Sequence, residues 1–453
     1  MEPTINSYSE ISNSNYEKIK NLLLDKTIPI DFKSELINLI KDHSSKTSNP
    51  PIAQLIETGM VPVLIDIRSQ FPPDEKTILN ILWIITNIFT GNKSDIDYVI
   101  NEKGIEYILE YIPNDNKEIV HQAVWGLSNI AGESTFHRDL ILKLNVVDKI
   151  FHYFKEETDL PILRTLAWFI SNLSRGHPLV DYELLKPCTC MGYLSYLWMF
   201  CVDEEIILDV LWSVSFISEI NSKSVEDLIN SNLIQNIVNE KFPLMKTKQN
   251  LMVPFLRTLG NIVSGDEAST WFMINLGILD QLVPFLEYSV LSIRKETAFI
   301  FSNIAAGSAM QVTAVVNIPN ILEKIQMILT NDDIKVKTEC VWIIMNLLSH
   351  KLSGVGEKLS QTNGLMEVFL KIYKDFDHSA EIQENLLENY KLYYQYLKEN
   401  GGLEKKIAYK QILKGFVEEL KEKNGVQLDD LEDEIQSDSE SDLEKMNNLK
   451  VED

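Results

Sequence analysis

Cysteine is scarce in this chain: four of its 453 residues, at Cys188, Cys190, Cys201 and Cys340. So few thiols in a chain of this length exclude a disulfide framework and favour a reducing environment. Cys188 and Cys190 are too close together for the usual spacing of zinc ligands, and His177 is the one candidate ligand nearby. We therefore expect neither a metal site nor a cofactor.

Positive charge is also in short supply. The chain has 42 Lys and Arg residues against 66 Asp and Glu residues, which gives a net charge of −24. Such an acidic chain is a poor candidate for binding nucleic acid or an anionic membrane and a good one for binding basic partners. The sequence has no apolar run of transmembrane length, and residues 1–14 lack the apolar core of a signal peptide. We expect a protein of the cytosol, the nucleus or both.

Catalytic motifs are missing as well. The sequence has no phosphate-binding loop, no nucleophile elbow and no cluster of metal ligands, and its seven His residues are scattered. We therefore expect a protein that binds its partners and is not an enzyme.

What the chain has instead is a repeat. A large side chain is followed four residues later by Asn, and this pair recurs at intervals of 42 to 45 residues. Intervals of this length are typical of armadillo-type repeats, which have three helices each. The lead positions are Trp83, Trp125, Trp168, Trp212, Arg257, Phe299 and Trp342, and the Asn positions are Asn87, Asn129, Asn172, Asn261, Asn303 and Asn346, with Phe216 in the Asn position after Trp212.

A second marker keeps the same rhythm. A Gly or Asn precedes apolar residues at Gly59, Gly104, Asn145, Asn232, Gly277, Asn317 and Gly364. Because Gly and Asn tolerate the left-handed conformation that ends a helix, each marker is expected to separate a short first helix from a second. The third helix carries the pair and is apolar on nearly all sides, which indicates burial between neighbouring helices. We predict an all-α fold: an armadillo-repeat, right-handed α-solenoid or superhelix of about nine to ten three-helix repeats.

The predicted solenoid covers residues 16–420. The pattern is loosest after Leu348, where one further repeat and a final amphipathic helix over 405–420 are predicted. Residues 1–15 are polar and without periodicity, and residues 421–453 are acidic and poor in bulky apolar residues, so we expect both end segments to be disordered.

The recurring pairs indicate a ligand. Asn is a poor helix former and is rare at buried sites without a partner, so Asn at one phase of six repeats suggests a shared external partner. Its amide can donate to and accept from an extended peptide, while neighbouring Trp rings leave slots for Lys or Arg. Acidic residues lie nearby: Glu133 follows Asn129 by four residues, and Asp209, Glu296 and Glu339 precede their lead positions by three. We predict that the third helices line a concave groove that binds an extended, Lys/Arg-rich segment.

These residues resemble the importin-α family of armadillo-repeat receptors for basic nuclear localisation signals. The resemblance rests on residues 122–134, 163–176, 256–265 and 302–307, and it includes the irregular positions Phe216 and Arg257. It implies two binding sites. The major site would comprise Trp83, Asn87, Gln122, Trp125, Asn129, Glu133, Trp168, Asn172, Asp209 and Trp212. The minor site would comprise Arg257, Asn261, Glu296, Phe299, Asn303, Glu339, Trp342 and Asn346.

The resemblance also implies a role. The chain would be a nuclear import adaptor that shuttles between cytoplasm and nucleus, with cargo proteins, importin-β and an export receptor as candidate partners. Phe299 stands where the family usually has Trp, which predicts a weaker minor site. Residues 1–50 have no basic cluster like the family's importin-β-binding segment. This difference leaves open a paralogue that binds signals without importin-β. An armadillo scaffold for other protein partners is a separate alternative.

Overall fold

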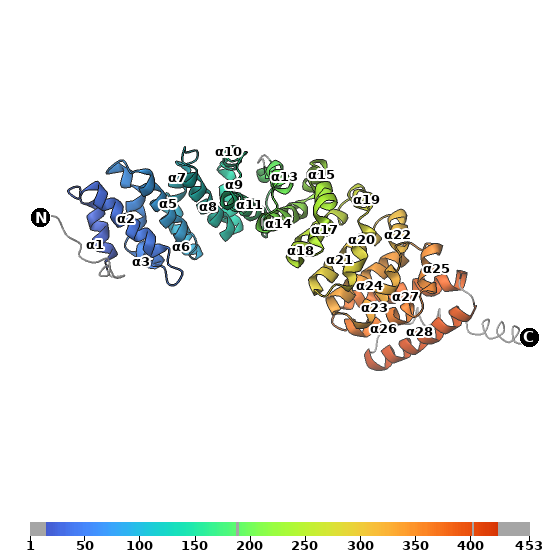
Figure 1. Ribbon diagram of the computed structural model, residues 1–453. Coiled ribbons are helices and arrows are strands. Elements are labelled where there is room, and N and C mark those ends of the chain that lie inside the picture. Colours follow the sequence, from blue (N-terminus) through green and yellow to red (C-terminus); the bar gives the residue numbers. More distant parts are fainter. Residues whose placement is uncertain (1–14, 187–189, 401–402, 425–453) are drawn as a thin grey trace, which may run out of the picture. The chain divides into compact units, whose positions relative to one another are not determined.

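The computed structural model describes residues 15–186, 190–400 and 403–424. Within these ranges every regular element is a helix, as the sequence predicted. The chain divides into two compact units, unit 1 (Met1–Ile237) and unit 2 (Val238–Asp453). Figure 1 draws unit 1 in blue to green and unit 2 in green to red. The two end segments predicted to be disordered lie almost entirely outside the described residues.

Unit 1 is a stack of three-helix repeats. In most repeats two short helices precede a long third helix, and the third helices α2, α5, α8, α11 and α14 each pack against the next. The helices are α1 (Tyr16–Leu24), α2 (Ile30–Ser44), α3 (Ile52–Glu57), α4 (Met60–Ile65), η2 (Ile67–Ser69), α5 (Glu75–Ile88), α6 (Lys93–Asn101), α7 (Gly104–Leu109), α8 (Lys117–Glu133), α9 (Thr135–Lys143), α10 (Val147–Tyr153), α11 (Leu160–Ser174), α12 (Tyr182–Leu185), α13 (Cys190–Phe200), α14 (Glu204–Ile220), α15 (Ser222–Asn230) and α16 (Leu233–Asn236).

Unit 2 follows the same plan, with α18, α21, α24 and α27 as its third helices. The predicted final helix is α28, which packs on α26 and α27. The helices are η3 (Ile237–Lys241), whose first residue is the last of unit 1, α17 (Phe242–Met245), α18 (Gln249–Val263), α19 (Glu267–Asn275), α20 (Leu279–Leu282), η4 (Val283–Glu287), α21 (Leu291–Ala305), α22 (Ala309–Val316), α23 (Ile321–Asn331), α24 (Ile334–Ser349), α25 (Ser353–Gln361), α26 (Leu365–Lys371), η5 (Ile372–Phe376), α27 (Ala380–Asn400) and α28 (Leu403–Asn424).

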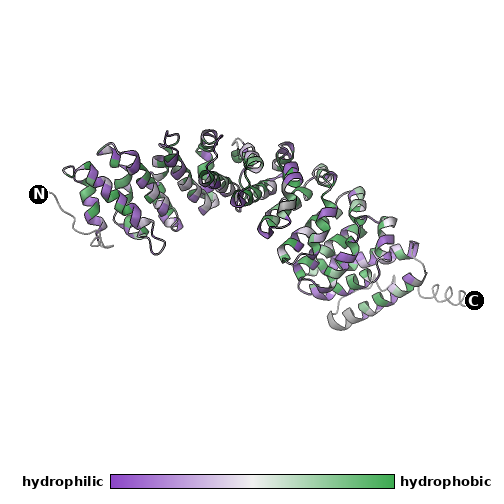
Figure 2. Cartoon of the chain, in the orientation of Figure 1, coloured by the Kyte–Doolittle hydropathy of each residue, from purple (hydrophilic) through white to green (hydrophobic). Residues whose placement is uncertain are grey.

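The third helices carry the core of each unit. In α5, Ile81, Leu82, Ile84 and Ile85 are completely buried. Full burial of such a side chain stabilises the fold by about 1.5–3 kcal/mol, and a lone repeat could not provide it. Figure 2 shows that hydrophobic and hydrophilic residues share the same helices, so each helix has both a packed and a solvent-facing side.

The left-handed residues occur close to where the second marker predicted them. Positive φ angles are found at Gly59, Asn145, Asn232, Gly277 and Gly364, as predicted. Two positions were wrong: the left-handed residue is Lys103 instead of Gly104, and Asn320 instead of Asn317. Gly104 serves a different purpose, because a Cβ there would lie 2.4 Å from Val99 Cγ1. It allows α7 to begin directly against α6.

Candidate functional site

Four tryptophans on successive third helices of unit 1 form what we call the tryptophan row: Trp83 on α5, Trp125 on α8, Trp168 on α11 and Trp212 on α14. Trp83 and Trp125 expose 37% and 41% of their surface, and the other two are partly exposed. By contrast, Trp198, which lies outside the row, is completely buried. Because a large apolar ring is normally placed in the core, its exposure at the lead positions marks this face of unit 1 as a candidate binding surface.

The amides beside the row are tied to the preceding repeat. Asn129 Nδ2 donates to the Thr86 carbonyl oxygen at 3.3 Å, and Asn172 Nδ2 donates to the Ser128 carbonyl oxygen at 3.0 Å. Each acceptor directly precedes the Asn of the previous repeat. These amides therefore have internal partners, which the sequence argument did not foresee. A primary amide has two N–H groups and an oxygen with two lone pairs, so one bond of this kind still leaves capacity for a ligand.

The three amides of unit 1 differ in exposure. Asn87 and Asn129 are partly exposed, whereas Asn172 is only 1% exposed. A Cβ on Gly132 would lie 3.1 Å from Asn172 Nδ2 and 3.3 Å from Arg175 Nη2, so both side chains lie close above this glycine. Arg175 also donates to the Gly132 carbonyl oxygen at 2.5 Å. A ligand can reach Asn172 only if the side chains around it move.

Other side chains of unit 1 lie against the rings of the row. His121, four residues before Trp125, stacks on its ring with centroids 6.3 Å apart and an angle of 29° between the planes. Burial lowers the pKa of His121, so this ring is uncharged at neutral pH. At α14, Trp212 stacks on Phe216 at 5.5 Å and 23°. The aromatic residue in place of Asn therefore extends the apolar surface of the row.

Acidic residues give the row its charge. Burial, together with the nearby Glu205 carboxylate, raises the pKa of Asp209 to about 6. The raised pKa means that burial and the neighbouring carboxylate disfavour the ionised form of Asp209, which a cation of a ligand would stabilise. Glu133 is the last residue of α8 and is exposed. Gln122, which was expected to flank the site, is only 6% exposed and contributes little surface.

Unit 2 carries a second row, which consists of Arg257 on α18, Phe299 on α21 and Trp342 on α24, all partly exposed. The Phe299 ring lies against the α18 backbone, since a Cβ on Gly260 would be 2.9 Å from its Cδ1 atom. Asn346 Nδ2 donates to the Ser302 carbonyl oxygen at 3.0 Å, which is the pattern of unit 1. Asn303 instead donates to the Phe299 carbonyl oxygen of its own helix at 2.8 Å. Asn261, after Arg257, is partly exposed.

The carboxylates beside the second row have partners within the unit. Burial raises the pKa of Glu339, and Ser302 Oγ donates to its Oε2 atom at 3.3 Å. Lys295 Nζ lies 3.7 Å from Glu296 Oε1. The ion pairs found among the described residues do not include Glu133, so the two rows differ in the acidic charge they leave for a ligand.

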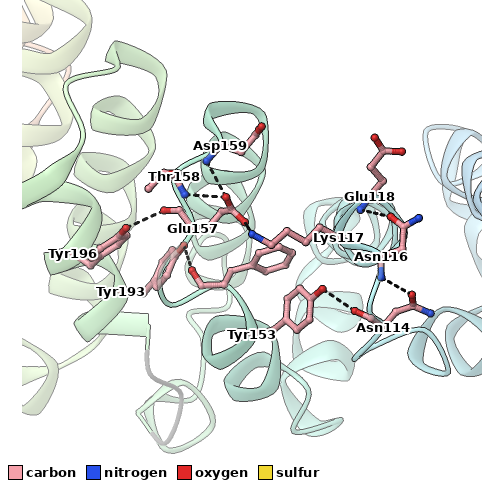
Figure 3. Close-up of polar contacts among 11 residues, drawn as sticks. Asn114, Asn116, Lys117, Glu118, Tyr153, Glu157, Thr158, Asp159, Tyr193 and Tyr196 are labelled. Atoms are coloured by element: carbon pink, nitrogen blue, oxygen red, sulfur yellow. Dashed lines mark hydrogen bonds and ion pairs between the residues drawn. The ribbon is translucent and has the colours of Figure 1, made fainter.

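Polar contacts join neighbouring repeats of unit 1 near the start of α8 and around the loop between α10 and α11 (Figure 3). Glu157 is 5% exposed, and its carboxylate accepts from Lys117 Nζ at 2.8 Å and from the backbone N–H groups of Thr158 and Asp159 at 2.8 and 2.9 Å. Tyr196 Oη donates to the Glu157 carbonyl oxygen at 2.9 Å. Because the carboxylate is satisfied by these donors, we interpret this cluster as a clamp between repeats and not as a binding site.

The part of the chain that the structure describes holds no group of three or more His, Cys, Asp or Glu residues placed to bind a metal ion. Cys190, Cys201 and Cys340 are buried, and Cys188 lies outside the described residues. In the same ranges no single helix is long and apolar enough to cross a membrane; one bent pair, α22 and α23, meets that test together, by length and composition alone.

The repeats and the packing of successive third helices define the class of the protein: an armadillo-repeat solenoid. The solved structure of an engineered protein superposes on the chain with a TM-score of 0.74 at 19% sequence identity, and the match covers 95% of this chain and 98% of the engineered one. This likeness concerns the fold alone. No family model matches the sequence.

Within this class, curated importin-α subunits are similar to the chain in sequence. Importin subunit alpha-1a of Oryza sativa subsp. japonica is 30% identical over 272 residues, which cover 59% of this chain and 50% of the relative. Importin subunit alpha-3 of Arabidopsis thaliana is 30% identical over 268 residues (58% and 49%), and importin subunit alpha-2 of Caenorhabditis elegans is 29% identical over 263 residues (57% and 48%). The chain spans about half the length of the curated relatives it matches. The resemblance to importin-α is thereby confirmed over that part of the chain.

Proposed function

We propose that unit 1 binds Lys- and Arg-rich nuclear localisation signals as extended peptides along the tryptophan row, and that the chain acts as a nuclear import adaptor. The observation that carries the proposal is the row itself, in which the exposed rings of Trp83 and Trp125 lie one helical turn from the partly exposed amides of Asn87 and Asn129. The similarity to importin-α subunits supports it.

The chemistry of the row fits an extended basic peptide. Indole faces accept the aliphatic stems of Lys and Arg, and a cation over an exposed ring gains about 0.5–1 kcal/mol. The remaining capacity of each Asn amide serves the peptide backbone, at about 0.5–1.5 kcal/mol for each hydrogen bond. Glu133 and Asp209 attract the charged head groups. Each contribution is small, so affinity requires several consecutive repeats.

We propose a weaker second site in unit 2, on the row formed by Arg257, Phe299 and Trp342. Phe299 offers a smaller ring than Trp, and the Asn303 amide donates within its own helix. Glu296 already has Lys295 beside it. A ligand at this row gains less from each repeat than a ligand at the tryptophan row.

The further partners and the location of the chain belong to the same proposal. As an adaptor, it would carry cargo proteins between cytoplasm and nucleus, with importin-β as carrier and an export receptor for its return. A pull-down of purified importin-β by the full chain tests the carrier step separately from peptide binding. Peptide binding without importin-β binding would favour a paralogue that acts by another route.

Peptide binding can be measured by fluorescence anisotropy with a labelled peptide that contains four consecutive lysines. Asn129→Ala combined with Glu133→Ala should weaken binding roughly tenfold or more, because two interactions of about 1 kcal/mol each are lost. The matched control combines Asn331→Ala with Glu323→Ala, which removes the same two groups from exposed positions on α23. Binding should also weaken with added salt. Unchanged affinity in the first double variant would rule out the proposed site.

A further inference from the structure

The first of the third helices, α2, continues the register of the row with different residues. It packs against α5 (Figure 1), and the contacts between the two helices join residues 42 or 43 positions apart. Thr77 Oγ1 lies 3.0 Å from Ser34 Oγ, Asn80 Nδ2 donates to Asn38 Oδ1 at 3.3 Å, and Asn87 Nδ2 donates to Ser44 and Ser45 at 3.2 Å. This register places Lys41 at the lead position of its repeat.

The lysine at that position lies against the first ring of the row. Lys41 Nζ is 5.4 Å from the centroid of the Trp83 ring and 2.7 Å from Asp42 Oδ1. The Lys41 side chain is 22% exposed, so most of its surface is covered by its neighbours. The face of Trp83 that is turned toward α2 is therefore occupied by an ammonium group of the chain itself. Between the next two lead positions, Trp83 and Trp125, both side chains are indoles and neither carries a charge.

We propose that Lys41 is a specificity-determining residue that ends the tryptophan row. It holds the outer face of Trp83, which denies that face to a cation of the ligand. A run of basic residues longer than the row then gains nothing from its last member. This inference rests on the proposed function of the row and adds where the row stops and which peptide residue it rejects.

The size of the effect follows from the contact. A ligand lysine at this face would have to displace Lys41 and would meet a like charge. Replacing Lys41 by Ala removes both obstacles and also frees the Asp42 carboxylate to attract the ligand. We expect a gain of about three- to tenfold in affinity for a peptide that presents a cation there, which is the range of a cation–π contact with some relief of repulsion. A peptide with Ala at that position should gain much less.

The test compares wild type with Lys41→Ala for two labelled peptides flanked by Ala: a run of four lysines, the core peptide, and a run of five. The fifth lysine can gain the face of Trp83 that is turned toward α2 only when Lys41 is absent. We therefore expect Lys41→Ala to increase the preference for the five-lysine peptide over the core peptide by about three- to tenfold relative to wild type.

Two further variants control for charge and for packing. Lys76→Ala removes an exposed lysine from α5, the helix that carries Trp83, and should change the affinities for the two peptides equally. Lys41→Arg keeps a cation on the ring and should behave as wild type. Failure of every peptide to bind the wild-type chain would overturn the proposed function. Binding of the core peptide with no preference in Lys41→Ala, or an equal preference in Lys76→Ala, would overturn the role of Lys41 alone.

Discussion

Asp209 should make the binding of a basic peptide depend on pH. Burial and the Glu205 carboxylate raise its pKa from the usual 3.8 to about 6. The group is therefore largely protonated at pH 5 and largely ionised at pH 7. A Lys or Arg of a ligand placed beside Asp209 stabilises the ionised form and lowers the pKa again. Because the ligand prefers the ionised form, its affinity should fall as the pH drops through 6.

Linkage between protonation and binding gives the size of this effect. If the ligand restores the usual pKa, affinity at pH 6 should be about half of that at pH 7, and affinity at pH 5 roughly tenfold lower. The free protein shows the opposite trend, since ionising a carboxyl with a raised pKa costs stability. Asp209→Asn should therefore stabilise unit 1 most at pH 7, about half as much at pH 5, and hardly at all below pH 3.8.

The assay is peptide anisotropy from pH 5 to 7.5 at constant ionic strength, with wild type and Asp209→Asn in parallel. His121 also gains a proton on the acid side of its usual pKa, and the new charge beside Trp125 should weaken binding as well. The slope that remains in Asp209→Asn measures that contribution, and the double variant with His121→Gln removes it. Equal slopes in wild type and Asp209→Asn would refute the assignment of Asp209 to the site.

Two further perturbations concern stability and can be followed by urea unfolding. Gly356→Ala on α25 should destabilise unit 2 by about 1–3 kcal/mol, because the added Cβ would lie 2.5 Å from the Tyr396 ring. Gly354→Ala, which has open space around its Cβ, should be neutral or stabilising by up to about 1 kcal/mol. Equal unfolding midpoints for the two variants would contradict this packing. Glu157→Gln should cost unit 1 about 1–2 kcal/mol at pH 7. Burial acts to raise the pKa of Glu157, but hydrogen bonds from Lys117 and two backbone N–H groups lower it below the usual 4.5. The stabilisation by Glu157 is therefore complete above pH 4.5 and is lost as the pH falls through the lowered pKa. A loss of stability between pH 6 and 8 would point to another group.

The fold could be predicted from the sequence because two markers recur in a fixed order. The spacing of Trp83, Trp125 and Trp168 identifies the third helices, and the structure confirms helices at each of them. The two errors in the second marker have a local cause: Gly104 was interpreted as a left-handed residue, although it is needed for close contact with Val99. The sequence repeat continues through residue 237 without interruption, so the division into two units was not foreseen.

The candidate site was harder to predict because its details depend on contacts between residues some 43 positions apart. The close approach of neighbouring helices decides that Asn129 donates to the Thr86 carbonyl oxygen. It also decides that Asn172 is buried beside Arg175. Counting one repeat back from Trp83 leads to Lys41. The recurring pair gives no sign of this position, because neither a Trp nor the following Asn occurs in that repeat. The assignment of residues to the two binding sites stays a prediction.

The bonds from Asn129, Asn172 and Asn346 to the third helix before each of them have a consequence for how such a surface can diversify. The acceptors at Thr86, Ser128 and Ser302 are backbone carbonyls, which every residue possesses. Substitutions at these three positions therefore leave the acceptor in place, and the interval between successive amides is conserved by the main chain. All three of these amides follow a tryptophan, whereas Asn303, which follows Phe299, donates within its own helix. The side chains at the acceptor positions can thus vary without changing the spacing of the amides, while a change of the lead residue accompanies a change of the partner of the amide.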